Sequence, residues 1–520
     1  MSTESQELNQ PTSKIWLHLL FITLLLFGLL FRFANLDKKA YWEDEAFTSL
    51  RIAGYTRAEL IEQVFDGHVA SVEELLQYQQ LNPDKTLIDT VNSLADDVHP
   101  PLYFVIGRLW VQRFGDSIAA TRSLSVLISL LVFPAMYWLC KELFHSSLIS
   151  FVAISLVAIS PFHIALAQEA RMYSLWTVTI LVSSLAILRS IRLKTKLSWG
   201  IYAITVALGF YTHWFTGIVI VGYGIYIVIS EGFHQNRTLI NYFLASFAGF
   251  IFFLPWPIFV GRRLTYLHSQ TTWTAKNLPL IGSNSLTEKW LTNLTNVFLD
   301  IDWFQGSPTS YFAYVLSIAL TSYSIYFIYR HASRQVYVFI LTLIGTMTLT
   351  LVIPDLLLGG QRSGASRYLI PSYLGIQLAI AYLFGNQILD ITRLKQQKIW
   401  RVFIMAFFSL GILSCTITQL DNRWRESEIF QFSNTINQFD RPLLISDARP
   451  STILPLSRYL APNVQLQLVV NPNIPQVTDG FSPIFLFNPS KNLRKSLEAS
   501  QQAEIKLMRP AGKFWQLEKL

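Results

Sequence analysis

Long apolar runs recur along most of the chain and set its pattern. Each is close to the ~20 residues that a helix needs to cross a hydrocarbon core about 30 Å thick. The pattern therefore predicts a polytopic α-helical membrane protein with about eleven transmembrane helices (about 11–13). The runs lie at 15–33, 119–139, 148–166, 172–188, 198–213, 214–230, 239–259, 310–329, 335–353, 369–385 and 400–418.

The segment 99–114 decides the sidedness of the chain. It is apolar but short, and it carries Arg108 and Arg113. If it does not span, basic clusters such as 189–196 and 393–401 fall in cytoplasmic loops, as the positive-inside rule expects. We therefore predict that 99–114 is an amphipathic or re-entrant helix at the outer interface.

Three larger polar regions then fall on the outer side: about 34–118, about 260–309, and the tail from 421. The tail is predicted to be a small soluble α+β domain, 421–520, that follows a membrane module, 1–420, containing the other two regions as outer loops. The predicted setting is a bacterial-type plasma membrane, with the C-terminus on its outer side. The elements expected in the tail are a helix near 429–439, strands at 443–446, 464–470 and 484–487, and a hairpin across 510–512.

The amino-acid composition agrees with that of a membrane protein. Hydrophobic residues make up 52% of the chain and charged residues 14%, whereas soluble domains carry about 25% charge. The net charge of +8 is dispersed between apolar runs, which argues against nucleic acid as a partner. The two cysteines form no C-x-x-C pair, so neither a disulfide framework nor a thiolate metal site is predicted.

Three consecutive carboxylates, Glu43, Asp44 and Glu45, follow the first apolar run. Adjacent acids at a membrane boundary repel one another unless a cation, a proton or a substrate compensates. One of them could act as a general base toward a hydroxyl or amine acceptor. The alternative is a solvated acidic patch beside the membrane.

The same loop ends in Asp97-Val-His99 before Pro100-Pro101. Paired prolines favour the start of a helix. Asp97 and His99, together with Asp44, are candidate ligands of a divalent metal, and the metal question stays open. The alternative is a proline-led helix start with a surface histidine.

Arginines at the ends of several apolar runs suggest that an anionic ligand binds there. At its predicted depth in the membrane, Arg171 needs an anionic partner, either Glu169 or a bound anionic ligand. Arg362 and Arg367 lie on the side where the charge rule disfavours cations. A phosphate-bearing substrate would suit them, because a guanidinium can bind two oxygens at once. Snorkelling or an ordinary interfacial arginine is the alternative.

No G-x-x-x-x-G-K-[ST] loop, H-E-x-x-H helix or G-x-S-x-G elbow occurs in the chain. These absences argue against ATP hydrolysis, a zinc-protease helix and an α/β-hydrolase nucleophile.

The ordered motifs resemble the GT-C superfamily of polytopic glycosyltransferases, in the branch that includes protein O-mannosyltransferases and aminoarabinose transferases. The resemblance is strongest over 14–230 and returns at 354–375. The motifs are Asp44-Glu45, His99-Pro100-Pro101-Leu102-Tyr103, Arg122, Glu169-Ala170-Arg171-Met172-Tyr173 and Arg367-Tyr368.

The resemblance implies an inverting glycosyltransferase that moves a hexosyl or pentosyl group from a polyprenyl-phosphate donor, within membrane lipid, to a lipid, glycan or protein acceptor. It implies a general-base or orienting role for Asp44, with Glu45 beside it. Arg171 and Arg367 are expected to hold the lipid phosphate. The wider set expected to bind donor or acceptor is Asp97, His99, Arg171, Tyr173, Arg367 and Tyr368.

The sequence is also compatible with two other functions. A secondary transporter or lipid or sugar flippase usually shows internal repeats and polar residues near mid-membrane. Here the charged residues gather at the ends of the runs instead. The other alternative is a non-catalytic membrane partner in glycan assembly.

Overall fold

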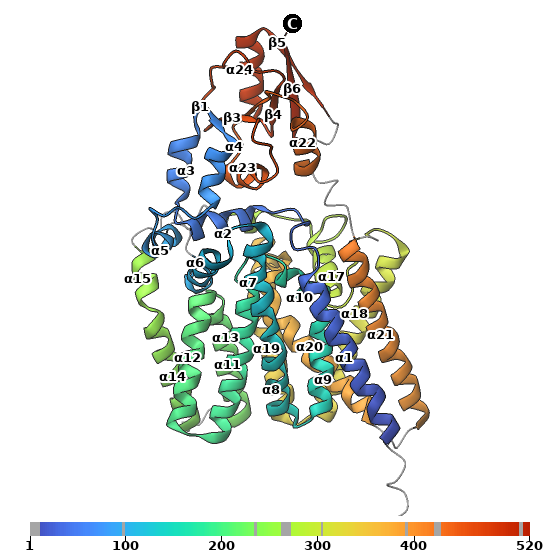
Figure 1. Ribbon diagram of the computed structural model, residues 1–520. Helices are drawn as coiled ribbons and strands as arrows, with labels where there is room; N and C mark the ends of the chain where they lie inside the picture. The colour runs from blue at the N-terminus through green and yellow to red at the C-terminus, as the bar shows by residue number, and fades with distance from the viewer. Residues whose placement is uncertain are drawn as a thin grey trace, which may run out of the picture. The chain divides into compact units, whose positions relative to one another are not determined.

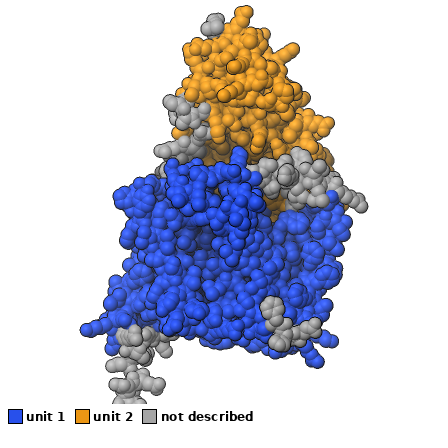
Figure 2. Space-filling model, turned by 180° about the vertical axis from the view of Figure 1, so that it is seen from behind, with its two compact units in different colours: residues 1–34, 125–420 blue, residues 35–124, 421–520 orange. Residues whose placement is uncertain are grey.

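The computed structural model describes two compact units, each built from segments far apart in the chain (Figures 1 and 2). Unit 1 comprises residues 1–34 and 125–420, and unit 2 comprises 35–124 and 421–520. The division differs from the predicted one, because the first large loop belongs with the tail. The described residues are 11–95, 99–232, 237–261, 272–302, 305–389, 394–420, 428–508 and 513–519.

Unit 1 is a helical bundle. Six described helices are long and apolar enough to cross a membrane, or eight if two bent helix pairs each count as one span. The chain is therefore a polytopic helical membrane protein, as predicted, although the number eleven is not confirmed. The six are Ile118–Phe144, Tyr173–Leu193, Pro308–His331, Arg334–Leu358, Ser366–Ile388 and Leu394–Leu420.

The other helices of unit 1 are shorter or bent. The predicted run 148–166 is broken into α9 (Ser147–Ala158) and α10 (Pro161–Ala167), which meet at 65°. Proline cannot donate the helical hydrogen bond, so Pro161 begins a new helix. The remaining described helices are α1 (Pro11–Phe33), α12 (Lys196–Thr212), α13 (Thr216–Glu231), α14 (Arg237–Phe253), α15 (Pro255–Gly261) and α17 (Leu286–Asn296).

The break exposes backbone carbonyls inside the bundle, and side chains satisfy them. Arg32 of α1 donates to Ala158 O at 2.7 Å and to Val157 O at 3.0 Å. Cys415 of α21 (Leu394–Leu420) lies 3.1 Å from Ile159 O. Buried backbone acceptors need such partners, so Arg32 has a structural role.

Unit 2 contains a six-stranded mixed sheet of order β1-β3-β2-β4-β6-β5. The central strand β2 is parallel to β3 and β4, and the outer pairs are antiparallel. The strands predicted in the tail are confirmed, and the two strands of the expected hairpin pair, although its turn lies outside the described residues. The strands are β1 (Asp66–Ser71), β2 (Leu443–Ser446), β3 (Gln465–Val469), β4 (Ile484–Phe487), β5 (Ala503–Leu507) and β6 (Phe514–Lys519).

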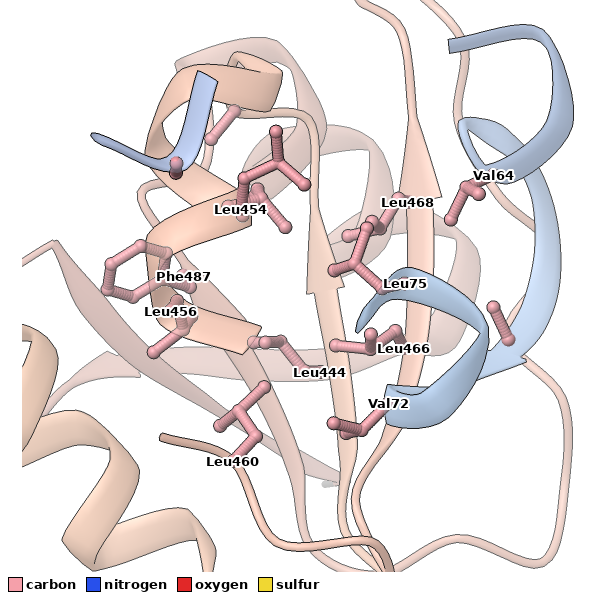
Figure 3. Packing of buried hydrophobic residues seen from close by; sticks show 14 of the residues in the cluster. Val64, Val72, Leu75, Leu444, Leu454, Leu456, Leu460, Leu466, Leu468 and Phe487 are labelled. Carbon is pink, nitrogen blue, oxygen red and sulfur yellow. The ribbon is translucent and has the colours of Figure 1, made fainter. Parts of the chain in front are cut away.

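Strand β1 comes from the first loop and was not predicted. Its sequence DGHVAS is short and polar, so it gives no alternating apolar pattern. Ala70 of β1 pairs with Leu466 of β3. The main core of unit 2 accordingly mixes the two segments: Figure 3 shows Val72 and Leu75 from the loop facing Leu466 and Leu468 from the tail.

Helices form the rest of unit 2. The predicted helix near 429–439 is α22 (Glu428–Ile436), and the predicted helix at 99–114 is α6 (Leu102–Phe114). Thirteen residues of α6 reach only about 20 Å at about 1.5 Å per residue, which is too short to span. The others are α2 (Glu43–Ala53), α3 (Arg57–Val64), α4 (Val72–Leu76), α5 (Leu87–Ala95), α23 (Pro450–Ser457), α24 (Lys491–Gln501) and the start of α7 (Ile118–Leu130).

Arg108 corrects one expectation about α6. Both arginines of the helix were expected at the interface, and Arg113 is exposed, but Arg108 is only 2% exposed. It donates to Ile52 O at 2.8 Å and to Thr90 Oγ1 at 3.1 Å. The neighbouring loop supplies the acceptors that the guanidinium requires when it is buried. Leu109 and Phe114 are the large hydrophobic side chains of α6 that are exposed.

Candidate active site

The three acids of the first loop form the first turn of α2. Carboxylates are favourable there because the helix dipole is positive at its N-terminus. The helix ends at Gly54, whose φ of 91° is a left-handed conformation that glycine adopts without strain. In this turn Glu43 is exposed, Asp44 is partly exposed and Glu45 is fully buried.

Glu45 forms a buried ion pair with Arg122 of α7. Arg122 Nε donates to Glu45 Oε1 at 2.7 Å, and Nη2 donates to Oε2 at 2.6 Å. Arg122 also donates to the carbonyls of Leu36, Lys39 and Ala40. The pair therefore holds the start of α2 and the segment 36–40 against α7, all within unit 2.

Tyr41 supports the same turn through its hydroxyl group. It is completely buried, and its hydroxyl donates to Glu45 O at 3.0 Å. Burial raises the pKa of the Tyr41 hydroxyl above its usual value. The phenol therefore stays protonated at neutral pH and can keep donating. Asp44 is thus the partly exposed acid on a turn whose neighbours are fixed.

The candidate metal ligands are only partly described. Asp97 lies outside the described residues. His99 is partly exposed and packs edge-on against Phe104 of α6, with ring centroids 5.9 Å apart. The helix begins directly after Pro101, as predicted. Over the described ranges, no group of three or more His, Cys, Asp or Glu side chains could hold a metal ion, so the metal expectation stays a prediction.

The predicted phosphate-binding arginines meet in unit 1. The guanidinium carbon of Arg171 lies 5.7 Å from the centroid of the Tyr173 ring, and that of Arg367 lies 5.8 Å from the same centroid. Arg367 also lies 5.7 Å from the Tyr368 ring. Two cations from distant segments thus flank one aromatic side chain at the start of α11 (Tyr173–Leu193). We call Arg171, Tyr173, Arg367 and Tyr368 the arginine cluster.

Backbone contacts fix the turn that carries Arg171. Gln168 donates from its side chain to Phe31 O at 2.7 Å and to Ala34 O at 2.8 Å. Ser125 Oγ donates to Arg171 O at 3.2 Å. Residues of α1 and α7 therefore position a buried arginine, which is 3% exposed.

The loop before Arg367 is equally well anchored. The buried carboxylate of Asp355 accepts from Ser363 N and Ser363 Oγ, both at 2.7 Å, and from Arg362 Nη1 at 3.0 Å. The ion pair with Asp355, at the end of α19 (Arg334–Leu358), therefore accounts for the position of Arg362 without a bound phosphate. From α17, Trp290 Nε1 donates to Ser363 Oγ at 2.9 Å.

His213 is a member of this region that the sequence reasoning missed. Its ring stacks on Trp176 at 4.2 Å and lies 6.2 Å from both Tyr173 and Tyr368. His213 Nδ1 accepts from Phe215 N at 3.1 Å, which leaves Nε2 as the protonated nitrogen of the neutral ring. A signal existed: His213 ends the apolar run 198–213, whose end lies on the same side as Arg171 by helix parity.

The predicted site residues therefore fall into two groups. Asp44, Glu45 and His99 belong to unit 2, and the arginine cluster belongs to unit 1. Each group is assembled from segments that are far apart in sequence.

Comparison with known proteins supports the predicted resemblance. Residues 98–259 match the family model described as dolichyl-phosphate-mannose-protein mannosyltransferase. No curated protein matches the chain. The matched segment includes His99, Arg122, Arg171, Tyr173 and His213.

Solved structures resemble the chain over nearly its whole length. ArnT from Cupriavidus metallidurans bound to undecaprenyl phosphate is 11% identical with a TM-score of 0.56, covering 96% of this chain and 97% of that one. Its apo form is 10% identical with the same TM-score, covering 98% of each chain. An oligosaccharyltransferase from Archaeoglobus fulgidus is 12% identical with a TM-score of 0.47, covering 88% of this chain and 65% of that one. The predicted resemblance to the GT-C superfamily is confirmed.

Proposed function

We propose, from the premise that this chain resembles the GT-C glycosyltransferases in fold and in its mannosyltransferase-family segment, that it transfers a sugar from a polyprenyl-phosphate donor to an acceptor. ArnT, which has a similar fold, was solved with undecaprenyl phosphate bound. The transfer inverts the anomeric carbon of a hexosyl or pentosyl group. The acceptor is a hydroxyl or amine of a lipid, glycan or protein.

The arginine cluster is the observation that carries this proposal. Arg171 and Arg367 flank Tyr173 and bring two permanent cations to one place. The leaving group of the donor is a phosphate that already carries negative charge, so its departure needs cations rather than an acid. Planar guanidinium groups match phosphate oxygens in pairs. Beside Arg367, the partly exposed ring of Tyr368 offers an aromatic surface to the sugar or the first isoprene unit.

The reaction makes one bond and breaks one bond at the anomeric carbon. An acceptor oxygen or nitrogen attacks that carbon, and the bond from the carbon to the phosphate oxygen breaks. The electron pair leaves with the lipid phosphate, beside Arg171 and Arg367. The acceptor proton passes to a carboxylate, and we assign this step to Asp44, with Glu45 as a positioning residue through its pair with Arg122.

The test is transfer of labelled sugar by the purified full-length protein. Arg171→Ala and Arg367→Ala are each expected to raise the donor KM about tenfold or more, because a hydrogen bond to a charged group contributes about 1.5–3 kcal/mol. Arg367→Lys should lose less, since it keeps the charge but not the planar fork. Arg330→Ala, at an exposed residue of α18 (Pro308–His331), is the control.

Two outcomes would contradict the proposal. If no polyprenyl-phosphate sugar is consumed while the protein moves such a lipid between leaflets, the chain is a flippase. If Arg171→Ala and Arg367→Ala keep the donor KM, the cluster does not bind the phosphate.

We further propose that the reaction takes place on the outer side of the membrane, with the tail there too. The support is the distribution of cations: Arg189, Arg192 and Lys194 lie at the end of α11 opposite Tyr173, and short basic segments stay in the cytoplasm. A reporter fused after Leu520 that works only outside the cytoplasm should be active. Activity of a strictly cytoplasmic reporter at that position would reverse the assignment.

A further inference from the structure

A second basic site lies at the other end of unit 1. A cavity of 450 Å³ opens between the last turns of α8 (Val132–Phe144) and α11. This volume is within the range of about 300–1,000 Å³ that is usual for small-molecule sites. The turn from α8 to α9 lies at the lower end of the bundle in Figure 1. The proposed donor chemistry uses none of the residues around this cavity.

Three cations and one carboxylate line the cavity. Lys141 comes from α8, and Arg189 and Arg192 come from successive positions on one face of α11. Glu142 accepts two hydrogen bonds from Arg192, at 2.5 and 2.9 Å. Lys141 Nζ donates to the neutral hydroxyl of Ser147 at 3.2 Å. The cavity therefore keeps an excess of two positive charges.

The remaining wall consists of His145, at the end of α8, and two apolar side chains. Trp138 lines the cavity and is 58% exposed, and Leu185 lines it from α11. Leu193 and Leu197, at the adjoining helix ends, are also exposed. Tryptophan and exposed leucines at the ends of membrane helices are typical of the boundary between headgroups and acyl chains. A ligand in this cavity would contact cationic side chains and apolar side chains at the same time.

The position separates this cavity from the arginine cluster. Tyr173 begins α11 and Leu193 ends it, and the helix has 21 residues. At about 1.5 Å per residue its ends are about 30 Å apart, the thickness of a hydrocarbon core. The cavity and the cluster thus belong to opposite membrane faces. Helix dipoles and the positive-inside rule explain cations at this end, but not their convergence with tryptophan on one cavity.

We propose that this cavity binds the phosphate headgroup of an anionic membrane phospholipid. The phosphodiester contacts Lys141 and Arg189, and the start of the acyl chains lies along Trp138 and Leu185. Basic pockets between membrane helices on the cytoplasmic side suit such headgroups. A lipid is favoured over a free anion because the cavity joins its charge to an apolar wall at the membrane boundary.

The test uses the full-length protein in detergent with mixed micelles of phosphatidylglycerol or phosphatidylcholine, read by melting temperature and native mass spectrometry. Phosphatidylglycerol should raise the melting temperature and remain bound, and phosphatidylcholine should do neither. Arg189→Gln and Lys141→Gln should each weaken phosphatidylglycerol binding about fivefold, the effect of one cation near an anionic surface. Arg189→Lys should restore most of the affinity.

Arg330→Gln is the matched control. Arg330 is exposed, and the adjacent His331 O accepts from Tyr382, whose ring packs on Phe144 at the end of α8. It is thus a cation at the same end of the bundle that does not line the cavity, and its variant should bind phosphatidylglycerol normally. Equal binding by Arg189→Gln and the original protein would overturn the proposal. So would equal stabilisation by phosphatidylcholine, or by inorganic phosphate alone.

Discussion

Glu43, Asp44 and Glu45 share one helical turn, yet each side chain has a different environment. Successive residues of a helix point about 100° apart, so one faces solvent, one is intermediate and one faces Arg122. The sequence analysis recognised the run of three acids and singled out Asp44 within it. The resemblance gave the base role to Asp44 and placed Glu45 beside it, but the pairing of Glu45 with Arg122 was not predicted, because Arg122 lies in α7, 77 positions along the chain.

The three acids should therefore respond differently to loss of charge. Asp44→Asn should leave the melting temperature unchanged and lower sugar transfer about 10²- to 10⁴-fold, the usual contribution of a general base. Glu45→Gln should instead lower stability by about 3–5 kcal/mol, because it leaves buried Arg122 without its counter-charge. Glu43→Gln is the control for both measurements. A fully active Asp44→Asn protein would remove Asp44 from the reaction.

His68 gives a pH-dependent contribution to the edge of the sheet. Its imidazole contacts the Asp66 carboxylate and lies 3.0 Å from Glu74 Oε1. The hydrogen bond with Asp66 raises the His68 pKa above 6.5. A raised pKa stabilises the folded state below the unfolded value, and this gain is lost as pH rises through the folded value. The stability difference between the original protein and His68→Gln should shrink as the pH rises from about 6.5, the unfolded value, through the raised pKa. A difference that grows over this range would exclude the assignment.

Helices α1 and α9 show how closely elements pack in unit 1. A Cβ added at Gly28 would lie 2.8 Å from both Ala158 Cβ and Ala158 O, close to the carbonyl that Arg32 binds. Small residues let membrane helices approach in this way. The apolar pattern predicted one continuous helix over 148–166 and missed the break, although Pro161 within the run was the signal for it.

Two glycine substitutions should have opposite effects. Gly28→Ala should lower the melting temperature, because α1 and the backbone of α9 must separate. Gly200→Ala is the matched control, since a Cβ there meets nothing within 4 Å, and alanine favours a helix by about 1 kcal/mol over glycine. Thermal melting of both purified variants decides this. A stabilising Gly28→Ala would show that the contact is loose.

At the scale of the molecule, two segments that are separated in sequence by the helices of unit 1 build one sheet. The tail's own strands were predictable from their apolar runs and turns. The contribution of β1 was not, because pairing over hundreds of residues leaves no local periodicity. The sidedness argument nevertheless put both segments on one face of the membrane, which is a precondition for their pairing.

The shared sheet predicts that damage in the tail will loosen the first loop. Leu466→Asp places a charge in the core against Ala70, and burying an uncompensated charge is very costly. Limited proteolysis should then cut within 57–78. Leu507→Asp is the control, since Leu507 is 40% exposed on β5. Protection of 57–78 in the Leu466→Asp variant would mean that the loop folds without the tail.

Pairing of β1 with β3 also sets an order of events during biosynthesis. A ribosome adding about 5–20 residues per second needs roughly 20–80 s to reach β3 after β1 has been made. Throughout that interval Val64, Val72 and Leu75 lack the strands that cover them. Translation of the last hundred residues is therefore the step that completes unit 2. A nascent chain halted before it would expose these apolar side chains to chaperones and proteases.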